Sequence, residues 1–209
     1  MGRAYSDITF TPTVREIQSS MGSRAQYAFL DQMENRQDSL GRREIAFVEE
    51  MDHFYQATVS ETGWPYVQHR GGPVGFLRLL DDKTLAFADY RGNRQYISIG
   101  NLAANDRAAL ILMDYPHRAR LKIYAHVEIR DLAADPALAE ALAVPGTKAK
   151  AERAIVLHLD AFDWNCPQHI VPRFTEGEVA QAVQPLKDRL IALEAENAAL
   201  RARIEEQIR

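Results

Sequence analysis

Short segments rich in β-branched and aromatic residues follow one another between residues 54 and 130, and this spacing constrains the fold more than any other feature. Turn-like stretches such as Gly71-Gly72-Pro73 and Asp81-Asp82-Lys83 connect several of them. Parallel strands need crossovers of about a dozen or more residues, so the spacing predicts an antiparallel barrel. The predicted strands are Phe54–Ser60, Tyr66–Arg70, Gly75–Leu80, Thr84–Ala88, Ala108–Met113, Arg120–Arg130 and, later in the chain, Ile155–Phe162.

Helical patterns flank and interrupt the strands. The N-terminal part is expected to be a helical arm that starts near Thr13 and breaks at Gly41. Further helices are predicted from Asn93, as N-cap, to near Asn105, and from Pro136 to Leu142. We therefore expect an N-terminal helical arm at residues 1–44, a barrel domain at 45–172 and a C-terminal helix at 173–209.

The C-terminal stretch has a different composition, high in Ala, Leu, Glu and Arg. Its apolar residues alternate at spacings of four and three, as on the d and a positions of a heptad repeat, with Asn197 at an a position. The pattern predicts a coiled coil between chains; the alternative is a helix that packs on its own barrel. The positions are Leu186, Leu190, Leu193, Asn197, Leu200 and Ile204.

Charge and composition exclude several classes of protein. The formal net charge is −4, which disfavours a nucleic-acid partner. The single cysteine, Cys166, cannot form a disulfide within the chain. Neither a signal-peptide core nor an apolar run of roughly 20 residues is found, so we expect a cytoplasmic protein without a membrane partner.

The strongest indication of a site is the segment from Asp89 to Gln95, between a predicted strand and a predicted helix. Arg91 and Arg94 flank Gly92, and a helix N-terminus there offers free N–H groups. Guanidinium groups bind phosphate through paired hydrogen bonds, which makes the segment a candidate anion site. The alternative is that both arginines are ordinary solvated surface charges.

The ordered motifs Gln68-His69-Arg70-Gly71-Gly72-Pro73, Asp89 to Ser98, Gly100-Asn101-Leu102 and Arg120-Leu121-Lys122-Ile123 resemble those of the pyridoxamine 5′-phosphate oxidase-like flavoproteins. The resemblance runs from about Ile45 to Pro172. It implies a mainly β fold, the six-stranded antiparallel split β-barrel that binds FMN, and a homodimer with an FMN site in each cleft between subunits.

The resemblance also implies which residues bind FMN. It places the phosphate against Arg94 and Gln95, and the flavin and its ribityl chain near Arg70. The full set of implied cofactor-binding residues is Arg70, Asp89, Tyr90, Arg91, Arg94, Gln95, Ser98, Arg120, Lys122, Trp164, Gln168 and His169.

Two positions depart from the best-known oxidases of this family. Gln95 stands where those oxidases have Lys, and Gln can hydrogen-bond a phosphate without neutralising it. Leu121 stands where they have Gln, so an amide that contacts the flavin ring is missing. Trp164, Gln168 and His169 could cover the flavin or could be structural, and Cys166 with His169 is too few ligands for zinc.

The function expected from the resemblance is an FMN-dependent oxidoreductase that transfers hydride through flavin N5, with NAD(P)H as a possible electron donor and an unknown small-molecule substrate. No catalytic residue is assigned. Oxidation of pyridoxamine phosphate itself is disfavoured, because the Arg-x-His substrate pattern is absent. The alternative is a flavin-binding sensor or carrier without catalysis.

Overall fold

The computed structural model describes residues 2–144, 150–164 and 166–208. The chain forms two compact units, one of residues 1–114 and 118–170, the other of residues 115–117 and 171–209. The predicted parts 1–44, 45–172 and 173–209 also contain residues 1, 145–149, 165 and 209, which lie outside the described residues. That three-part division stays a prediction.

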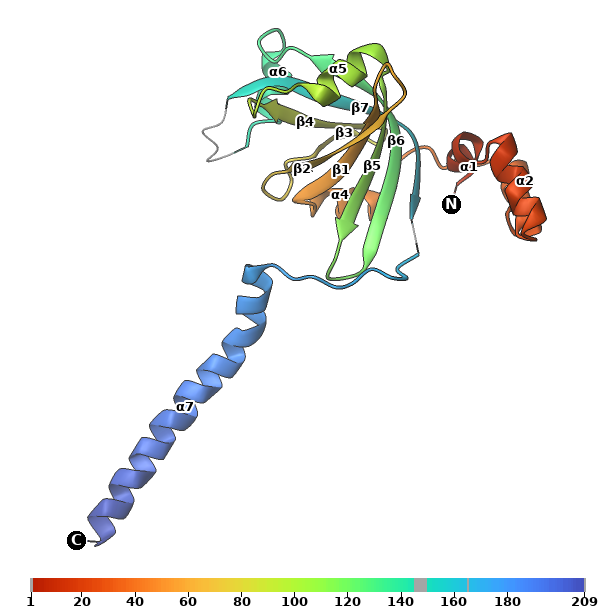
Figure 1. Ribbon diagram of the computed structural model, residues 1–209. Helices are drawn as coiled ribbons and strands as arrows, with labels where there is room; N and C mark the ends of the chain where they lie inside the picture. The colour runs from red at the N-terminus through yellow and green to blue at the C-terminus, as the bar shows by residue number, and fades with distance from the viewer. Residues whose placement is uncertain (1, 145–149, 165, 209) are drawn as a thin grey trace. The chain divides into compact units, whose positions relative to one another are not determined.

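The first unit is built on one antiparallel sheet with the order β2-β1-β5-β6-β7-β4-β3 (Figure 1). The described residues form seven strands, so the six expected from the resemblance is wrong by one. All seven lie where the residue pattern predicts strands. They are β1 (His53–Val59), β2 (Pro65–Gly71), β3 (Arg78–Asp81), β4 (Thr84–Tyr90), β5 (Arg107–Asp114), β6 (Ala119–Arg130) and β7 (Ala151–Trp164).

The sheet curls into a split barrel. Phe54 on β1 contacts Phe87 on β4, with ring centroids 5.3 Å apart, although three strands separate β1 from β4 in the sheet order. Arg70 on the edge strand β2 reaches Asp89 on β4 in the same way, at 2.8 Å. Side chains rather than backbone ladder bonds therefore close the barrel between β2 and β4.

Alternation of side chains places one face of each strand in the barrel core. Along β1, Phe54, Gln56 and Thr58 are buried while their neighbours are partly exposed. Period-two alternation is the pattern of a strand with one buried face, which is why these segments could be recognised in the sequence. Leu121, Ile123, Ala125 and Val127 on β6 form the same pattern.

Strand β7 is buried on both faces at residues 154–157 and 161–163, where helices cover its outer side, while His158 between them is exposed. Leu138 and Leu142, in and just after α6 (Pro136–Ala141), pack with Val156. Tyr5 of α1 (Arg3–Thr9) packs with Ala161. The apolar residues of the arm and of α6 therefore complete the barrel's outer layer.

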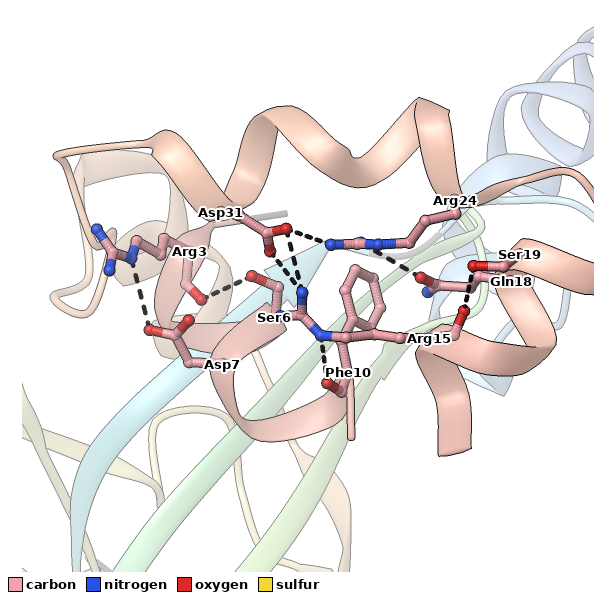
Figure 2. A network of polar contacts seen from close by, with 9 residues as sticks. All are labelled: Arg3, Ser6, Asp7, Phe10, Arg15, Gln18, Ser19, Arg24 and Asp31. Atoms are coloured by element: carbon pink, nitrogen blue, oxygen red, sulfur yellow. Dashed lines mark hydrogen bonds and ion pairs between the residues drawn. The ribbon is translucent and has the colours of Figure 1, made fainter. Parts of the chain in front are cut away.

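The N-terminal helices hold one another through charges (Figure 2). Asp31 accepts from Arg15 and from Arg24, and Arg15 also donates to the Phe10 carbonyl. The helices joined in this way are α2 (Pro12–Ser20), α3 (Arg24–Tyr27) and the 3-10 helix η1 (Ala28–Gln32); α4 (Arg42–Glu49) follows them in the chain. Helix α2 begins after its cap Thr11 rather than at Thr13, and Gly41 is the N-cap of α4, where its N–H donates to Glu44 at 3.0 Å.

Helix α5 (Ile97–Ala104) begins later than predicted. Its N-cap is Tyr96 in the left-handed region, at φ 53°. Asn93 instead accepts from the Gln95 N–H at 3.2 Å, which forms a local turn. The prediction of Asn93 as N-cap is therefore wrong, because its side chain accepts a hydrogen bond within a turn that precedes the N-cap Tyr96.

The second unit contains α7 (Glu176–Ile208), a single helix with Pro185 inside it. None of its described residues is buried. Leu186, Leu190 and Leu193 of the predicted stripe are 69%, 56% and 43% exposed. Among the described residues, none of the helices combines the length and the hydropathy of a membrane span.

Candidate functional site

A pocket of about 90 Å³ lies between β2, the end of β4 and the loop that leads to α5. Six of the twelve residues predicted for the cofactor line it, and Arg91 belongs to the same loop. The six are Arg70, Asp89, Tyr90, Arg94, Gln95 and Ser98. Residues from two separate stretches of sequence, 66–70 and 89–99, therefore meet in one place.

The loop that forms one wall of the pocket has an unusual backbone. Arg94 and Tyr96 both have positive φ, at 63° and 53°. Residues other than glycine seldom occupy this region, and such positions concentrate at ligand sites because the surrounding structure must hold them there. The backbone here agrees with the charges in indicating a candidate site in this segment.

Arg70, one of the residues that line the pocket, is held in place by three contacts. Its Nη1 donates to Asp89 Oδ1 at 2.8 Å and its Nε to Gln56 Oε1 at 3.3 Å. Its guanidinium also lies over the Phe87 ring, 5.5 Å from the centroid. Because the Arg70 side chain is only 14% exposed, water screens this ion pair weakly.

Two residues of β7 extend this ion pair into a network. Arg153 Nε lies 3.7 Å from Asp89 Oδ2, and its Nη2 lies 2.6 Å from Glu152 Oε2. Glu152 also pairs with Arg91 at 3.3 Å and accepts from the Tyr96 hydroxyl at 3.3 Å. The loop is therefore tied to β7 by charge as well as by backbone.

Arg94 differs from the other arginines of the network. Among the described residues it has no ion-pair or hydrogen-bond partner, and it is exposed. The pocket and its ion-pair network contain four guanidinium groups and two carboxylates, which leaves an excess of two positive charges. The guanidinium groups belong to Arg70, Arg91, Arg94 and Arg153, and the carboxylates to Asp89 and Glu152. The pocket can therefore bind an anion without any rearrangement of its ion pairs.

Hydrogen bonds position α5 at the other wall. Ser98 donates to Gln68 Oε1 on β2 at 2.8 Å, and the Asn101 amide donates to Thr58 on β1 at 3.0 Å. Ser98, Asn101 and Thr58 are buried and Gln68 is partly buried, so these contacts hold the helix in a defined place.

Within this chain, neither Lys122 nor Arg120 lines the pocket. Lys122 Nζ is 3.2 Å from Asp163 Oδ2 and 4.7 Å from the centroid of the Tyr5 ring. Burial lowers the pKa of Lys122, but Tyr5 and Asp163 raise it by more, so the pKa lies above its ordinary value. Arg120 donates to the Cys166 carbonyl at 3.4 Å.

Trp164 lies at the end of β7 against α4. Its indole N–H donates to Glu44 at 2.6 Å, its ring meets the edge of Phe47, and Arg43 lies over it at 4.1 Å. Gln168 and His169 are exposed in the loop that follows β7. In this single chain the structure thus places five of the predicted residues apart from the pocket: Arg120, Lys122, Trp164, Gln168 and His169.

A family model described as Pyridoxamine 5′-phosphate oxidase matches residues 44–163. The chain belongs to this family. The match covers β1 to β6, all of β7 except its last residue, and all residues that line the pocket. No curated protein matches the chain.

Several solved structures are similar to this chain at low sequence identity. A putative pyridoxamine 5′-phosphate oxidase from Lactobacillus delbrueckii is 19% identical, with TM-score 0.46, over 60% of this chain and 94% of that one. HupZ of Group A Streptococcus is 16% identical, with TM-score 0.45, over 65% and 99%. An FMN-binding protein from Syntrophomonas wolfei is 13% identical, with TM-score 0.43, over 70% and 97%.

The sequence did not reveal the two β7 residues of the ion-pair network beside the pocket. Glu152 and Arg153 lie about 60 residues after Asp89 and become neighbours because Asp89 pairs with Arg153 in the β4–β7 ladder. Gln56 and Gln68 were likewise unassigned. A polar residue on the inward face of a predicted strand, as Gln56 is on β1, was the available signal.

Proposed function

We propose that the chain binds FMN with its phosphate in the pocket between β2 and α5, and that it acts as an FMN-dependent oxidoreductase. The observation that carries the proposal is Arg94, an exposed guanidinium without a partner among the described residues, in a pocket whose other arginines are paired. Family membership supports a flavin as the cofactor.

The charges of the pocket fit a phosphate monoester. The excess of two positive charges matches the roughly −1.5 to −2 charge that such a phosphate carries near neutral pH. In the proposal Arg94 neutralises the phosphate, Gln95 adds an amide donor, and the Asp89 pair holds Arg70 in place. The absence of Lys at position 95 is then offset by Arg91 and Arg153 nearby.

The proposal includes a homodimer. A phosphate pocket of about 90 Å³ is too small for a whole flavin, so the rest of FMN must extend beyond it. The resemblance places the flavin in a cleft between subunits, where Arg120, Lys122, Trp164, Gln168 and His169 of a second copy could contribute. In one chain these five lie apart from the pocket.

Bound FMN would supply hydride transfer through its N5 atom, with NAD(P)H as the proposed donor. The chain's own residues bind and orient the phosphate end, and the paired, weakly exposed Arg70 keeps a fixed positive charge in the pocket lining. We assign no proton-transfer residue. A cytoplasmic location agrees with the exposed single thiol Cys166.

The test is to purify the protein, release any cofactor by heat and identify it, then add NADH or NADPH anaerobically to the flavin-loaded protein. The proposal predicts FMN in the supernatant and loss of the flavin absorbance near 450 nm on reduction. Protein that neither contains FMN nor binds it when supplied would overturn the proposal. Bound FMN that neither nucleotide reduces would favour a non-catalytic sensor or carrier.

A further inference from the structure

We propose that α7 binds α7 of a second copy of this chain as a parallel, in-register, two-stranded coiled coil. The inference goes beyond the flavin proposal and does not depend on it. It concerns the orientation and register of the pair, and it rests on three observations on one helix.

The first observation is an unpartnered apolar stripe. Leu186, Leu190, Leu193, Leu200 and Ile204 are each between 43% and 69% exposed, although they follow one face of a continuous helix. The stripe spans the a and d positions from Leu186 to Ile204, whose alternating spacing is that of a coiled-coil seam. Pro185 precedes Leu186 and occupies an outward c position, so its ring does not interrupt the seam.

The second observation is that the charges beside the stripe have no partners within the helix. In the heptad frame the g positions hold Arg189, Glu196 and Arg203, and the e positions hold Lys187, Glu194 and Arg201. Among the described residues none of these six forms an ion pair or hydrogen bond, whereas Gln184 in the same helix donates to Asp188. Their charges are available to a second helix.

The signs of these charges select an orientation. In a parallel in-register pair, each g residue faces the e residue of the following heptad, so Arg189 faces Glu194 and Glu196 faces Arg201. By symmetry each attractive pair occurs twice. A shift of one heptad would instead place Arg189 against Arg201.

An antiparallel pair aligned along its full length has the opposite character. Such a pair brings g against g and e against e, so Glu196 faces its own copy, Glu194 faces its own copy, and Arg189 faces Arg203. Every one of these contacts is repulsive. Sliding the helices by a heptad relieves the repulsion but shortens the seam.

The third observation is Asn197 at an a position. In a parallel pair a positions face a positions, so two Asn197 side chains can hydrogen-bond each other. In an antiparallel pair a faces d, and the amide would meet a leucine without a partner. A buried polar group without a partner costs about 1 to 3 kcal/mol, so Asn197 also favours the parallel pair.

The orientation can be tested in the full chain by disulfide trapping. In a Cys166→Ser background, which removes the exposed native thiol, Ile204→Cys places one thiol at an a position near the helix end. A parallel in-register pair brings the two copies close enough for a disulfide, whereas an antiparallel pair holds them near opposite ends of the seam. Ala202→Cys, at an outward f position, is the matched control.

Mild oxidation is expected to link most of the Ile204→Cys protein into covalent dimers and little of the Ala202→Cys protein. Absence of dimer in both variants, or equal yields in both, would overturn the parallel pairing. Arg189→Glu should lower the cross-linking rate at position 204 several-fold, and adding Glu194→Arg should restore it. An unchanged rate in Arg189→Glu would overturn the register. FMN content, measured in the same samples, should not change, so failure here is separable from failure of the flavin proposal.

Discussion

In the barrel, large apolar side chains such as Phe54 and Leu121 are fully buried, and most charges near the pocket are paired within the chain. In α7, the leucines of the stripe are about half exposed, and the charges beside them are unpaired among the described residues. The barrel sheet completes its own core, whereas the apolar stripe of α7 has no buried residue. Arg94, which lines the pocket and has no partner among the described residues, marks the place where a ligand is expected.

The largest expected effect is in the barrel core. Phe54→Ala removes a ring that stacks with Phe76 at 5.8 Å and meets Phe87 at 5.3 Å, and it should lower the free energy of unfolding by about 3 to 5 kcal/mol. Leu193→Ala in α7 is the control and should leave the unfolding of the barrel unchanged. Urea denaturation followed by tryptophan fluorescence measures both; equal losses would contradict the separation of the two regions.

The paired charges of the pocket give the next effect. Asp89→Ala leaves Arg70 and Arg153, 14% and 19% exposed, without their shared carboxylate, at a cost of about 2 to 4 kcal/mol in unfolding free energy. Asp160→Ala removes an exposed partner of His126 and should cost less than about 1 kcal/mol. Similar costs for the two variants would show that the Asp89 network is as weak as a surface pair.

In α7, a gain is expected instead of a loss. Asn197→Leu replaces a polar a residue by an apolar one, and burial of a leucine between two helices is worth about 1.5 to 3 kcal/mol. Self-association should therefore tighten by roughly tenfold or more in sedimentation equilibrium, while disulfide trapping at position 204 becomes less efficient as antiparallel pairs become allowed. Unchanged self-association would mean that position 197 does not lie in a seam.

The smallest effect concerns an exposed charge cluster on the barrel. Hydrogen bonds from Arg130, which has the larger effect, and from His158 lower the pKa of Glu128 from 4.5 to about 2. Because the folded-state pKa is the lower one, the stabilisation is present above pH 4.5 and is lost as the pH falls toward about 2. Because the cluster is exposed, the free energy of unfolding of wild type should exceed that of Glu128→Gln by less than about 1 kcal/mol above pH 4.5. This difference should shrink as the pH falls toward about 2. A difference that grows on acidification would contradict the assigned pairing.

The sequence predicted the strands better than the site. Alternation along β1 and β6 is local information, and so is the heptad spacing of α7, so both were found from residue patterns. The start of α5 was misplaced because Asn93 uses its side chain in a turn, which composition alone does not distinguish from a cap. The roles of Glu152 and Arg153 depend on the β4–β7 register, which no local pattern contains.

The central claim, a flavin phosphate held by Arg94, is tested most directly by comparing FMN with riboflavin, which lacks the phosphate. Arg118→Ala is the matched control, because Arg118 is also exposed, has a positive φ of 54° where Arg94 has 63°, and lies in another turn. Fluorescence titration should show FMN bound roughly 10 to 100 times more weakly by Arg94→Ala than by wild type or Arg118→Ala, with riboflavin bound equally by all three. Equal FMN affinity in Arg94→Ala and Arg118→Ala would contradict the account.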